Sequence, residues 1–412
     1  MQPNKGINMQ TDRRNFLKTS AMAAVASGMP ALSESTSPKH VYEVGAYYFP
    51  SWHVDPRNEA VHGKGWTEWN VLQRGLPRFP GHQQPKIPLW GYEDESIPAV
   101  FEKKIQAAAD NKITYFIFDW YWYEGKPFLN AGLDQGYLQS SNNGRLKFCL
   151  MWANHDWINI FPAKLNAPKW MQYKGAVNRE QFDGITNYII EKYFSHPSYF
   201  KVDDCPYFSV FQLSHLVSAL GGVTEAGKAL ESFRRRTQAA GYKDLHLNAI
   251  KSGISFKSAA QQADARQMLQ DISCRSTTSY CWVQGPTPKS FPSYDYADAM
   301  QLAIPHWERA ASDFPLPYYP NVSMGWDSTP RTCQSDIFTP SDYPFTAVMT
   351  GNTPERFKEA LQAAKQFVDR KGGTQRILNI NAWNEWTEGS YLEPGTTHTM
   401  EYLKAVRDVF SS

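Results

Sequence analysis

The sequence predicts an α/β protein: a single (β/α)8 TIM barrel with long βα loops that form an active-site cleft. Three observations predict this fold. Short apolar runs alternate with amphipathic segments, 412 residues suit one large or two medium domains, and polar and aromatic side chains collect where the apolar runs end. Hydrophobic residues make up 42% of the chain and charged residues 20%, so we expect a large core.

The N-terminal segment is expected to be an export signal. Arg13 and Arg14, followed by residues 15–18, resemble the twin-arginine motif, and the run at 19–31 is only mildly apolar. A transmembrane helix needs about 20 strongly apolar residues, and no later run is that long. The sequence therefore predicts a signal peptide over residues 1–36, no membrane span, and a periplasmic or secreted protein.

Residues 40–412 carry the pattern of one catalytic barrel. The apolar runs predict eight strands, at residues 41–49, 114–121, 146–152, 206–213, 245–250, 276–280, 322–325 and 376–381. The amphipathic segments predict helices at 98–110, 178–194, 224–240, 258–269, within 294–311, and after Thr353, where Pro354 takes the first helical position. An open doubly wound sheet is the alternative, but no G-x-G-x-x-G follows the first strand.

Candidate ligand-binding residues follow the predicted strands. The long segments 51–97, 123–145 and 152–176 would be βα loops, which line the C-terminal face of a barrel, where active sites lie. The candidates there are Tyr48, Trp66, Glu68, Asp119, Trp122, Trp152, Asn154, His155, Trp282, Trp326, Asp327, Asn384 and Trp386. Aromatic faces stack on sugar C–H groups, amides bind hydroxyls and carboxyl pairs transfer protons, so these residues predict a carbohydrate cleft.

Composition argues against other partners. The formal net charge is +2 without a basic stripe, so nucleic acid is not an expected partner. The chain has five cysteines but no C-x-x-C or H-E-x-x-H, so no metal or cofactor is expected. An exported protein of this kind could form up to two disulfides. Oligomeric state is left open.

Several motifs resemble one family. GKGWTEWNV with FPGHQQPKIP, then FDWYWYEGK, CLMWANHDW, GWDSTPR and NAWNEWTEGSYLEP are similar, in this order, to blocks of the WbsX-type, glycoside hydrolase family 99-like proteins, and they span about residues 45–400. The resemblance implies a (β/α)8 barrel. The best-understood members are retaining endo-acting α-mannosidases, and others, found beside polysaccharide-biosynthesis genes, have been labelled glycosyltransferases.

The resemblance also implies catalytic roles for Glu385 and Glu388, the E-x-x-E of the hydrolases. Glu385 would act as a base on the sugar 2-hydroxyl, so that O2 attacks C1 and forms a 1,2-anhydro sugar. Glu388 would be the general acid, holding a proton near neutral pH, and later the base that activates water. Internal attack needs O2 trans to the leaving group, which α-manno-configured sugars such as mannose and rhamnose supply, and the tethered nucleophile gains effective molarity.

The sequence thus predicts an exported glycoside hydrolase that cleaves α-linked, manno-configured residues in a polysaccharide. Thr387 stands where the hydrolases have His, which departs from the mannosidase pattern. A polysaccharide lyase, a glycosyltransferase and a non-catalytic carbohydrate-binding protein remain as alternatives. Arg331, Lys64 and His53 could bind an anion, so sulfated or uronic substrates are left open, as are the sugar, its linkage and endo or exo action.

Overall fold

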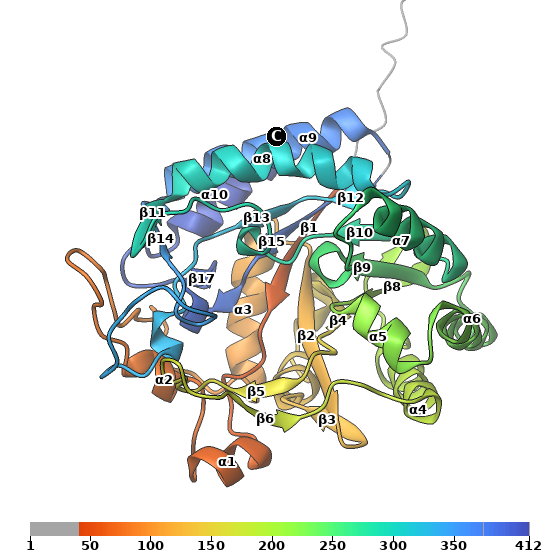
Figure 1. The fold of residues 1–412 in the computed structure, drawn as a ribbon, viewed down its shortest axis with the longest axis horizontal. Helices are drawn as coiled ribbons and strands as arrows, with labels where there is room; N and C mark the ends of the chain where they lie inside the picture. Colours follow the sequence, from red (N-terminus) through yellow and green to blue (C-terminus); the bar gives the residue numbers. More distant parts are fainter. Residues whose placement is uncertain (1–40, 374, 412) are drawn as a thin grey trace, which may run out of the picture. The chain divides into compact units, whose positions relative to one another are not determined.

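The strands of this protein form a parallel barrel with interleaved helices (Figure 1). The structure is a computed structural model that describes residues 41–373 and 375–411. The signal peptide predicted over residues 1–36 lies outside the described residues. None of the helices in the described part is long and apolar enough to cross a membrane.

The main sheet runs β12-β10-β9-β8-β4-β2-β1-β15-β13. Its strands are β1 Val41–Tyr48, β2 Tyr115–Tyr123, β4 Lys147–Trp152, β8 Cys205–Val210, β9 His246–Ile250, β10 Ser276–Thr278, β12 Tyr318–Tyr319, β13 Asn321–Ser323 and β15 Gln375–Asn381. The end strands β12 and β13 are separated only by Pro320, which has no N–H to donate. They act as two halves of one strand, so the eight predicted strand positions all occur.

Helices follow most strands, as predicted. They are α3 Pro98–Asp110, α4 Arg179–Ile189, α6 Val223–Ala239, α7 Ala259–Asp271, α8 Tyr296–Asp313 and α9 Pro354–Lys371. The structure adds α10 Glu401–Phe410, which packs on α9 (Figure 1). Predicted strand four ends earlier than expected, because Leu213 begins the helix α5, Leu213–Ala219. Between β2 and β4 the chain forms a π-helical turn, Gly132–Tyr137, and the 3-10 turn Asn143–Arg145.

Short elements lie in the connections, most of them in the βα loops. These are α1 Pro56–His62, α2 Trp69–Gln73, β3 Lys126–Phe128, β5 Trp157–Asn159, β6 Trp170–Tyr173, β7 Lys201–Val202, β11 Ser293–Asp295, β14 Val348–Thr350, β16 Asn384–Glu385 and β17 Ser390–Tyr391. The π-helical segment Ile190–Phe194 extends α4. Single 3-10 turns follow several strands, at Lys251–Gly253, Trp282–Gln284, Thr329–Arg331 and Trp386–Glu388.

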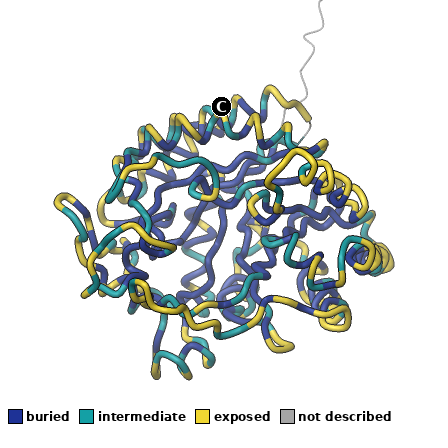
Figure 2. Tube along the Cα trace, in the orientation of Figure 1, coloured by how far each residue is buried: buried dark blue, intermediate teal, exposed yellow. Residues whose placement is uncertain are grey.

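The barrel strands are buried, whereas the helices alternate buried and exposed residues (Figure 2). Part of the barrel interior is polar and internally satisfied. The Tyr115 hydroxyl donates to Asn379 Oδ1 over 2.6 Å, and Asn379 Nδ2 donates to Thr278 Oγ1 over 3.0 Å. Buried polar groups are tolerated when they are hydrogen-bonded, and such networks make a core rigid.

The N-terminus of α4 provides a test of local stability. Asn178 Oδ1 accepts from the Gln181 backbone N–H and Gln181 Oε1 accepts from the Asn178 N–H, both over 2.9 Å, which is a capping box. We expect Asn178→Ala to lower the free energy of unfolding by about 1 kcal/mol, measured by urea denaturation, and Asn178→Ser to lose clearly less because it keeps an acceptor. Equal losses in the two variants would contradict this role.

Candidate active site

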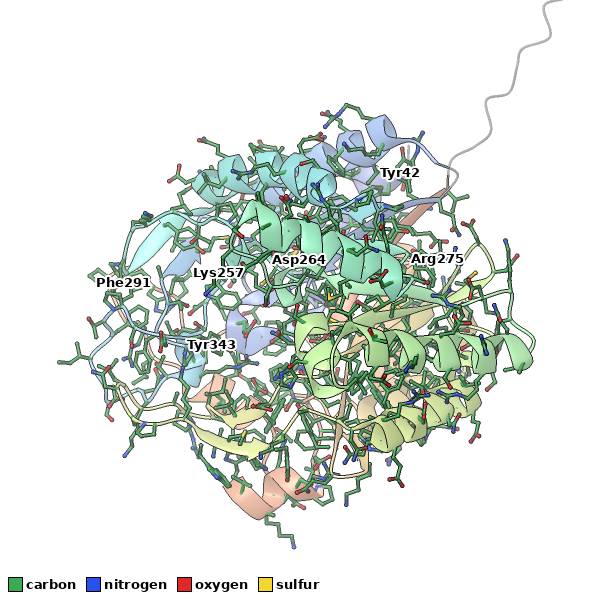
Figure 3. The ribbon with its side chains drawn as sticks, turned by 45° about the vertical axis from the view of Figure 1, so that its right-hand side comes forward. Tyr42, Lys257, Asp264, Arg275, Phe291 and Tyr343 are labelled. Atoms are coloured by element: carbon green, nitrogen blue, oxygen red, sulfur yellow. The ribbon has the colours of Figure 1, made fainter. Side chains whose placement is uncertain are left out.

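A cavity of about 570 Å³ opens beside the C-terminal ends of the barrel strands. Much of its wall is aromatic and its carboxyl groups are few. The lining includes Phe49, Asp119, Tyr121, His155, Trp157, Phe161, Phe211, Tyr280, Trp326, Arg331, Tyr343, Glu385 and Glu388. Figure 3 labels Tyr343, which belongs to the long segment between β13 and β14. A concave, largely apolar site with a few convergent polar groups is typical of ligand binding.

Arg331 is the central cation of this cavity. Its Nε and Nη2 donate to one oxygen of Glu68 over 3.0 and 2.8 Å, its Nη1 donates to Glu388 Oε1 over 2.6 Å, and its Nη2 lies 3.3 Å from Glu385 Oε2. The rings of Phe49 and Phe161 lie 5.3 and 5.4 Å from the guanidinium carbon. Burial alone would lower the pKa of Arg331, but the neighbouring carboxylate of Glu68, followed by Tyr343 and Glu388, raises it well above its usual value. Arg331 is therefore permanently charged.

Glu388 presents one oxygen to the protein. Oε1 accepts from Arg331 and from the Tyr343 hydroxyl, each over 2.6 Å. These two donors occupy Oε1, so a proton carried by Glu388 would sit on Oε2. A carboxyl held in this way can offer a proton to a ligand without losing its orientation.

Glu385 belongs to a second hydrogen-bond network, which includes Tyr280 and Asp119. The Tyr280 hydroxyl lies 2.9 Å from Glu385 Oε1 and 2.9 Å from Asp119 Oδ2. Burial raises the pKa of Glu385 well above its usual range, and the negative charge of Glu388 raises it further. Burial also raises the pKa of Asp119, and the hydrogen bond from Tyr280 only partly opposes this. Both carboxyls therefore resist ionisation more than a solvated carboxyl does.

The local sequence explains how the two glutamates reach the cavity. Glu385 ends β16, and Glu388 ends the 3-10 turn that follows. Gly389 comes next with φ of +66°, and a Cβ there would lie 2.6 Å from the Asp327 side chain. Glycine adopts this backbone readily and leaves room for the segment containing Arg331, which explains the Gly after E-x-x-E.

Asp327 fixes that neighbouring segment. Its Oδ2 accepts from His82 Nε2 over 2.8 Å and from Gln84 over 2.7 Å, while its Oδ1 accepts from the Thr329 hydroxyl over 2.6 Å. Burial would raise the pKa of Asp327, but the hydrogen bond and charge of His82 hold it below its usual value. Asp327 thus acts as an anionic anchor for the turn that carries Arg331, outside the cavity lining.

A buried ion cluster supports the turn from behind. Lys104 of α3 contacts Glu95 Oε1 over 2.5 Å and Glu393 Oε1 over 2.8 Å, and these side chains are almost fully buried. Asn384 Nδ2 donates to Glu95 over 3.1 Å, and Trp386 Nε1 donates to Glu393 over 2.9 Å. Burial raises the pKa of Glu95 to about 7, although Lys104 opposes the shift. This cluster ties α3 to both ends of the catalytic turn.

The structure brings together only part of the predicted set. Asp119, His155, Trp326, Glu385 and Glu388 line the cavity, and Glu68 lies beneath it, bound to Arg331. Trp326 donates from Nε1 to Thr346 over 2.9 Å. His155 Nδ1 lies 2.8 Å from the Asp156 carbonyl oxygen, and burial lowers the pKa of His155, which favours the neutral ring.

Tyr48, Trp122 and Trp152 face the other way, which corrects the expectation that they contact a sugar in the cleft. Side chains alternate along a strand, so Tyr47, Tyr121 and Met151 turn inward while their successors turn outward. Tyr48 packs on Phe101 of α3, and Trp152 packs near Phe182 of α4. Trp122 lies near Trp120 and Tyr188 and lines a separate groove of about 500 Å³.

The other predicted contacts also lie behind the cavity wall, and the expectation that they touch the ligand is corrected for each. Asn154 bonds the Gln212 backbone, and Asn384 bonds the Phe49 backbone. Trp282 Nε1 donates to the Asn321 carbonyl over 2.8 Å. Trp66 stacks on His62 and also contacts Phe161. Trp386 stacks on Tyr391. Asp327 holds the turn that carries Arg331. These residues hold the loops that form the site.

Sequence reasoning did not select the three residues that hydrogen-bond the carboxyls of the cavity. Tyr280 ends the sixth predicted strand, so its position was a usable signal, and Arg331 stood out only as a possible anion ligand. Tyr343 lies in a loop with no motif, so no signal pointed to it. The anion-binding idea loses support, because Arg331 is engaged by carboxylates and His53 is buried with a lowered pKa caused by desolvation.

The described residues contain neither a cluster arranged to bind a metal ion nor a disulfide. In residues 41–373 and 375–411, no group of three or more His, Cys, Asp or Glu side chains is arranged to hold a metal ion. The five cysteines, all within the described part, are free thiols. Burial raises the pKa of Cys149 and Cys281 well above the usual range, which favours the unreactive thiol.

Comparison with known proteins identifies a matching family and related sequences. A model of the family described as "Glycosyltransferase WbsX" matches residues 44–406. The uncharacterized protein WxcX of two strains of Xanthomonas campestris pv. campestris is 28% identical over 375 residues, which cover 89% of this chain. The match covers 49% of WxcX, so the chain spans about half the length of the curated relatives it matches.

Solved structures show the same fold at low identity. The GH99 endo-alpha-mannosidase from Bacteroides thetaiotaomicron is 13% identical, with a TM-score of 0.53 over 90% of this chain and 96% of that chain. A structure described as a glycoside hydrolase-like protein is also 13% identical, with a TM-score of 0.55 over 94% of this chain and 97% of that chain. These likenesses confirm the predicted barrel.

The buried cluster behind the turn gives a testable prediction. Lys104→Met should destabilise the protein by about 3–5 kcal/mol, because it leaves two buried carboxylates without their cation. Lys103→Met is the matched control on the same helix: Lys103 pairs with Glu93 at a half-exposed position, where the loss should stay below about 1 kcal/mol. Urea unfolding of both variants measures the difference, and similar values would contradict the role given to Lys104.

Proposed function

The chain belongs to the WbsX family, and we propose that it is an exported glycoside hydrolase that cleaves α-linked, manno-configured residues in a polysaccharide. One observation carries the proposal: Glu385 and Glu388 lie on the two terminal nitrogens of one guanidinium at the wall of an aromatic cavity. Export rests on the sequence motif alone. Because the chain spans about half of its curated relatives, the substrate and the activity of any longer protein are part of the proposal.

The proposed reaction has two steps. In the first, Glu385 takes the proton of the sugar 2-hydroxyl, O2 attacks C1, and Glu388 gives its Oε2 proton to the leaving oxygen. In the second, Glu388 takes a proton from water, which opens the 1,2-anhydro sugar at C1, while Glu385 returns its proton to O2. Configuration is retained, because C1 is inverted twice. Each carboxyl ends in the protonation state in which it began.

The hydrogen bonds suit these roles. Glu388 is fixed through Oε1, which leaves Oε2 for the leaving group. Glu385 receives Arg331 on one oxygen and faces Tyr280 on the other, and both donors stabilise the ionised form that a base requires. A conventional retaining site would need a carboxylate nucleophile at C1, whereas this scheme uses the substrate's own oxygen.

The charge of the cavity favours a neutral sugar over a nucleotide sugar. Asp119, Glu68, Glu385 and Glu388 surround Arg331, whose charge is already matched by carboxylates. A diphosphate would need free cations or a metal near the reacting carbon. A hydrolase therefore fits better than a nucleotide-sugar transferase, despite the family's description, and an anionic sugar at the reacting position is disfavoured.

Variants of the two glutamates test the mechanism. Glu388→Gln should lower kcat on the polysaccharide by about 10²–10⁴-fold, because proton donation to the leaving oxygen is lost. With an aryl α-mannoside whose acidic phenol departs without a proton, kcat/KM, which reports the first step, should fall much less, whereas kcat should stay low because the glutamine cannot deprotonate the water of the second step. Glu385→Gln should lose activity on both substrates. Product release followed by mass spectrometry measures this, and near-wild-type turnover of the polysaccharide by Glu388→Gln would contradict the assignment.

The pH dependence gives a further test. Burial and the charge of Glu388 raise the pKa of Glu385, so the base is protonated and inactive over a wider acidic range than an ordinary glutamate. The acid limb of kcat/KM should therefore lie well above about pH 4.3, the value for an unperturbed glutamate. In Glu388→Gln, assayed with the aryl glycoside, the acid limb of kcat/KM should stay close to that of the wild type, because glutamine replaces a Glu388 that is protonated and uncharged in the active form. A limb that moves well to lower pH would show that Glu388 is ionised in the active form and would contradict its role as the acid.

A further inference from the structure

Tyr280 contacts two carboxyl groups, Asp119 and Glu385, through its single hydroxyl group. The hydroxyl has one hydrogen, yet it lies 2.9 Å from Asp119 Oδ2 and 2.9 Å from Glu385 Oε1. If both carboxyls were ionised, the hydroxyl could satisfy one of them and would turn a lone pair toward the other. The arrangement is fully hydrogen-bonded only if one carboxyl carries a proton and donates it to the Tyr280 oxygen.

The surrounding charge requires such a proton as well. With every carboxyl ionised, Asp119, Glu385, Glu388 and Glu68 would place four negative charges around the one positive charge of Arg331, in a site where all these side chains are buried. Uncompensated buried charge is costly, so neutral forms are favoured. The titratable groups that face the trio are Arg331, Glu68, Glu388, Tyr47, Tyr121 and Cys281. Burial raises the pKa of Tyr47, Tyr121 and Cys281, which keeps these three groups neutral.

The two carboxyls differ in their other oxygen. Glu385 Oε2 lies 3.3 Å from the Arg331 guanidinium, which favours ionised Glu385. Asp119 Oδ1 is buried and has no hydrogen-bond partner among the described residues. An ionised Asp119 would leave that oxygen uncompensated, whereas a protonated Asp119 carries no charge to compensate. The asymmetry places the proton on Asp119.

We propose that Asp119, Tyr280 and Glu385 share one proton, and that Tyr280 holds it on Asp119 so that Glu385 is ionised and ready to act as a base. In this state the Asp119 O–H donates to the Tyr280 oxygen, and the Tyr280 O–H donates to Glu385. Transfer of both hydrogens along the chain breaks the Asp119 O–H and Tyr280 O–H bonds, forms a new Tyr280 O–H and a Glu385 O–H, and leaves Asp119 ionised. That second state has no base.

This inference deepens the proposed function and rests on it for the role of Glu385. Asp119 and Tyr280 are positioning residues here: they set the charge of the base without taking part in a bond change of the substrate. The sharing of a proton, in contrast, is a property of the ligand-free protein. It can be measured without any sugar.

Infrared difference spectroscopy of the ligand-free protein near neutral pH tests the inference. The wild-type minus Asp119→Asn spectrum should show loss of one protonated-carboxyl C=O band that shifts in D₂O, because the asparagine amide donates to Tyr280 in place of the acid proton. The subtraction removes other protonated carboxyls, such as Glu95, from the signal. Tyr121→Phe, which deletes a neighbouring cavity hydroxyl, is the control and should keep the band. An unchanged spectrum in Asp119→Asn, or an equal loss in Tyr121→Phe, would overturn the inference.

Tyr280→Phe supplies a second readout. Without the bridging hydroxyl, Glu385 loses a donor to its charged form, so it should take up a proton at higher pH and the protonated-carboxyl signal should grow. A hydrogen bond to a charged group is worth about 1.5–3 kcal/mol, so the acid limb of kcat/KM should move up by about 1–2 pH units. An unmoved limb would overturn the role of Tyr280. If the infrared result holds but no α-mannoside is cleaved, the substrate assignment fails and the shared proton stands.

Discussion

The organisation of this site depends on one buried guanidinium. Arg331 lies between the rings of Phe49 and Phe161 and contacts Glu68, Glu385 and Glu388, which come from the first and the last βα loops. An arginine can hold several carboxylates at once because its five donors lie in a rigid plane. The same contacts that join the first and last βα loops at the cavity also hold the two proposed catalytic groups in place.

That arrangement has an electrostatic consequence. One positive charge cannot balance all the acids around it, so burial keeps protons on some of them, and hydrogen-bond partners decide which. Glu388 has one oxygen bound and one free, whereas Glu385 is contacted on both oxygens, one of them through the hydroxyl that also touches Asp119. Two chemically identical side chains three positions apart thereby acquire different tasks. The difference comes from neighbours on other strands rather than from the E-x-x-E motif itself.

The fold was more predictable than the site. Strand and helix positions follow from local hydrophobic periodicity, so the predicted bounds of α3 match the observed ones. Pro320 divides the seventh strand into β12 and β13, which explains why its apolar run in the sequence is short. Site residues depend on the face of each strand. Asp119 and Tyr121 turn inward, and the same alternation turns Trp122 outward. The sequence could have shown this if Asp119 had been taken as an inward-facing position and the alternation had been counted from it. Tyr343, by contrast, enters from an irregular loop, where no period exists to read.

The family's description as glycosyltransferases and a hydrolytic site are chemically compatible. In the proposed scheme the first step leaves a 1,2-anhydro sugar, and the second step needs only an oxygen nucleophile that Glu388 can deprotonate. Water gives hydrolysis, and a sugar hydroxyl gives transfer from one glycan to another, with the same residues in the same roles. The outcome then depends on what occupies the aromatic part of the cavity when the intermediate forms, because an acceptor stacked on rings such as Trp157 or Trp326 would displace water. The carboxylates that already match the charge of Arg331 disfavour a nucleotide-sugar donor in either case, so a transferase built on this site would draw its sugar from a glycan.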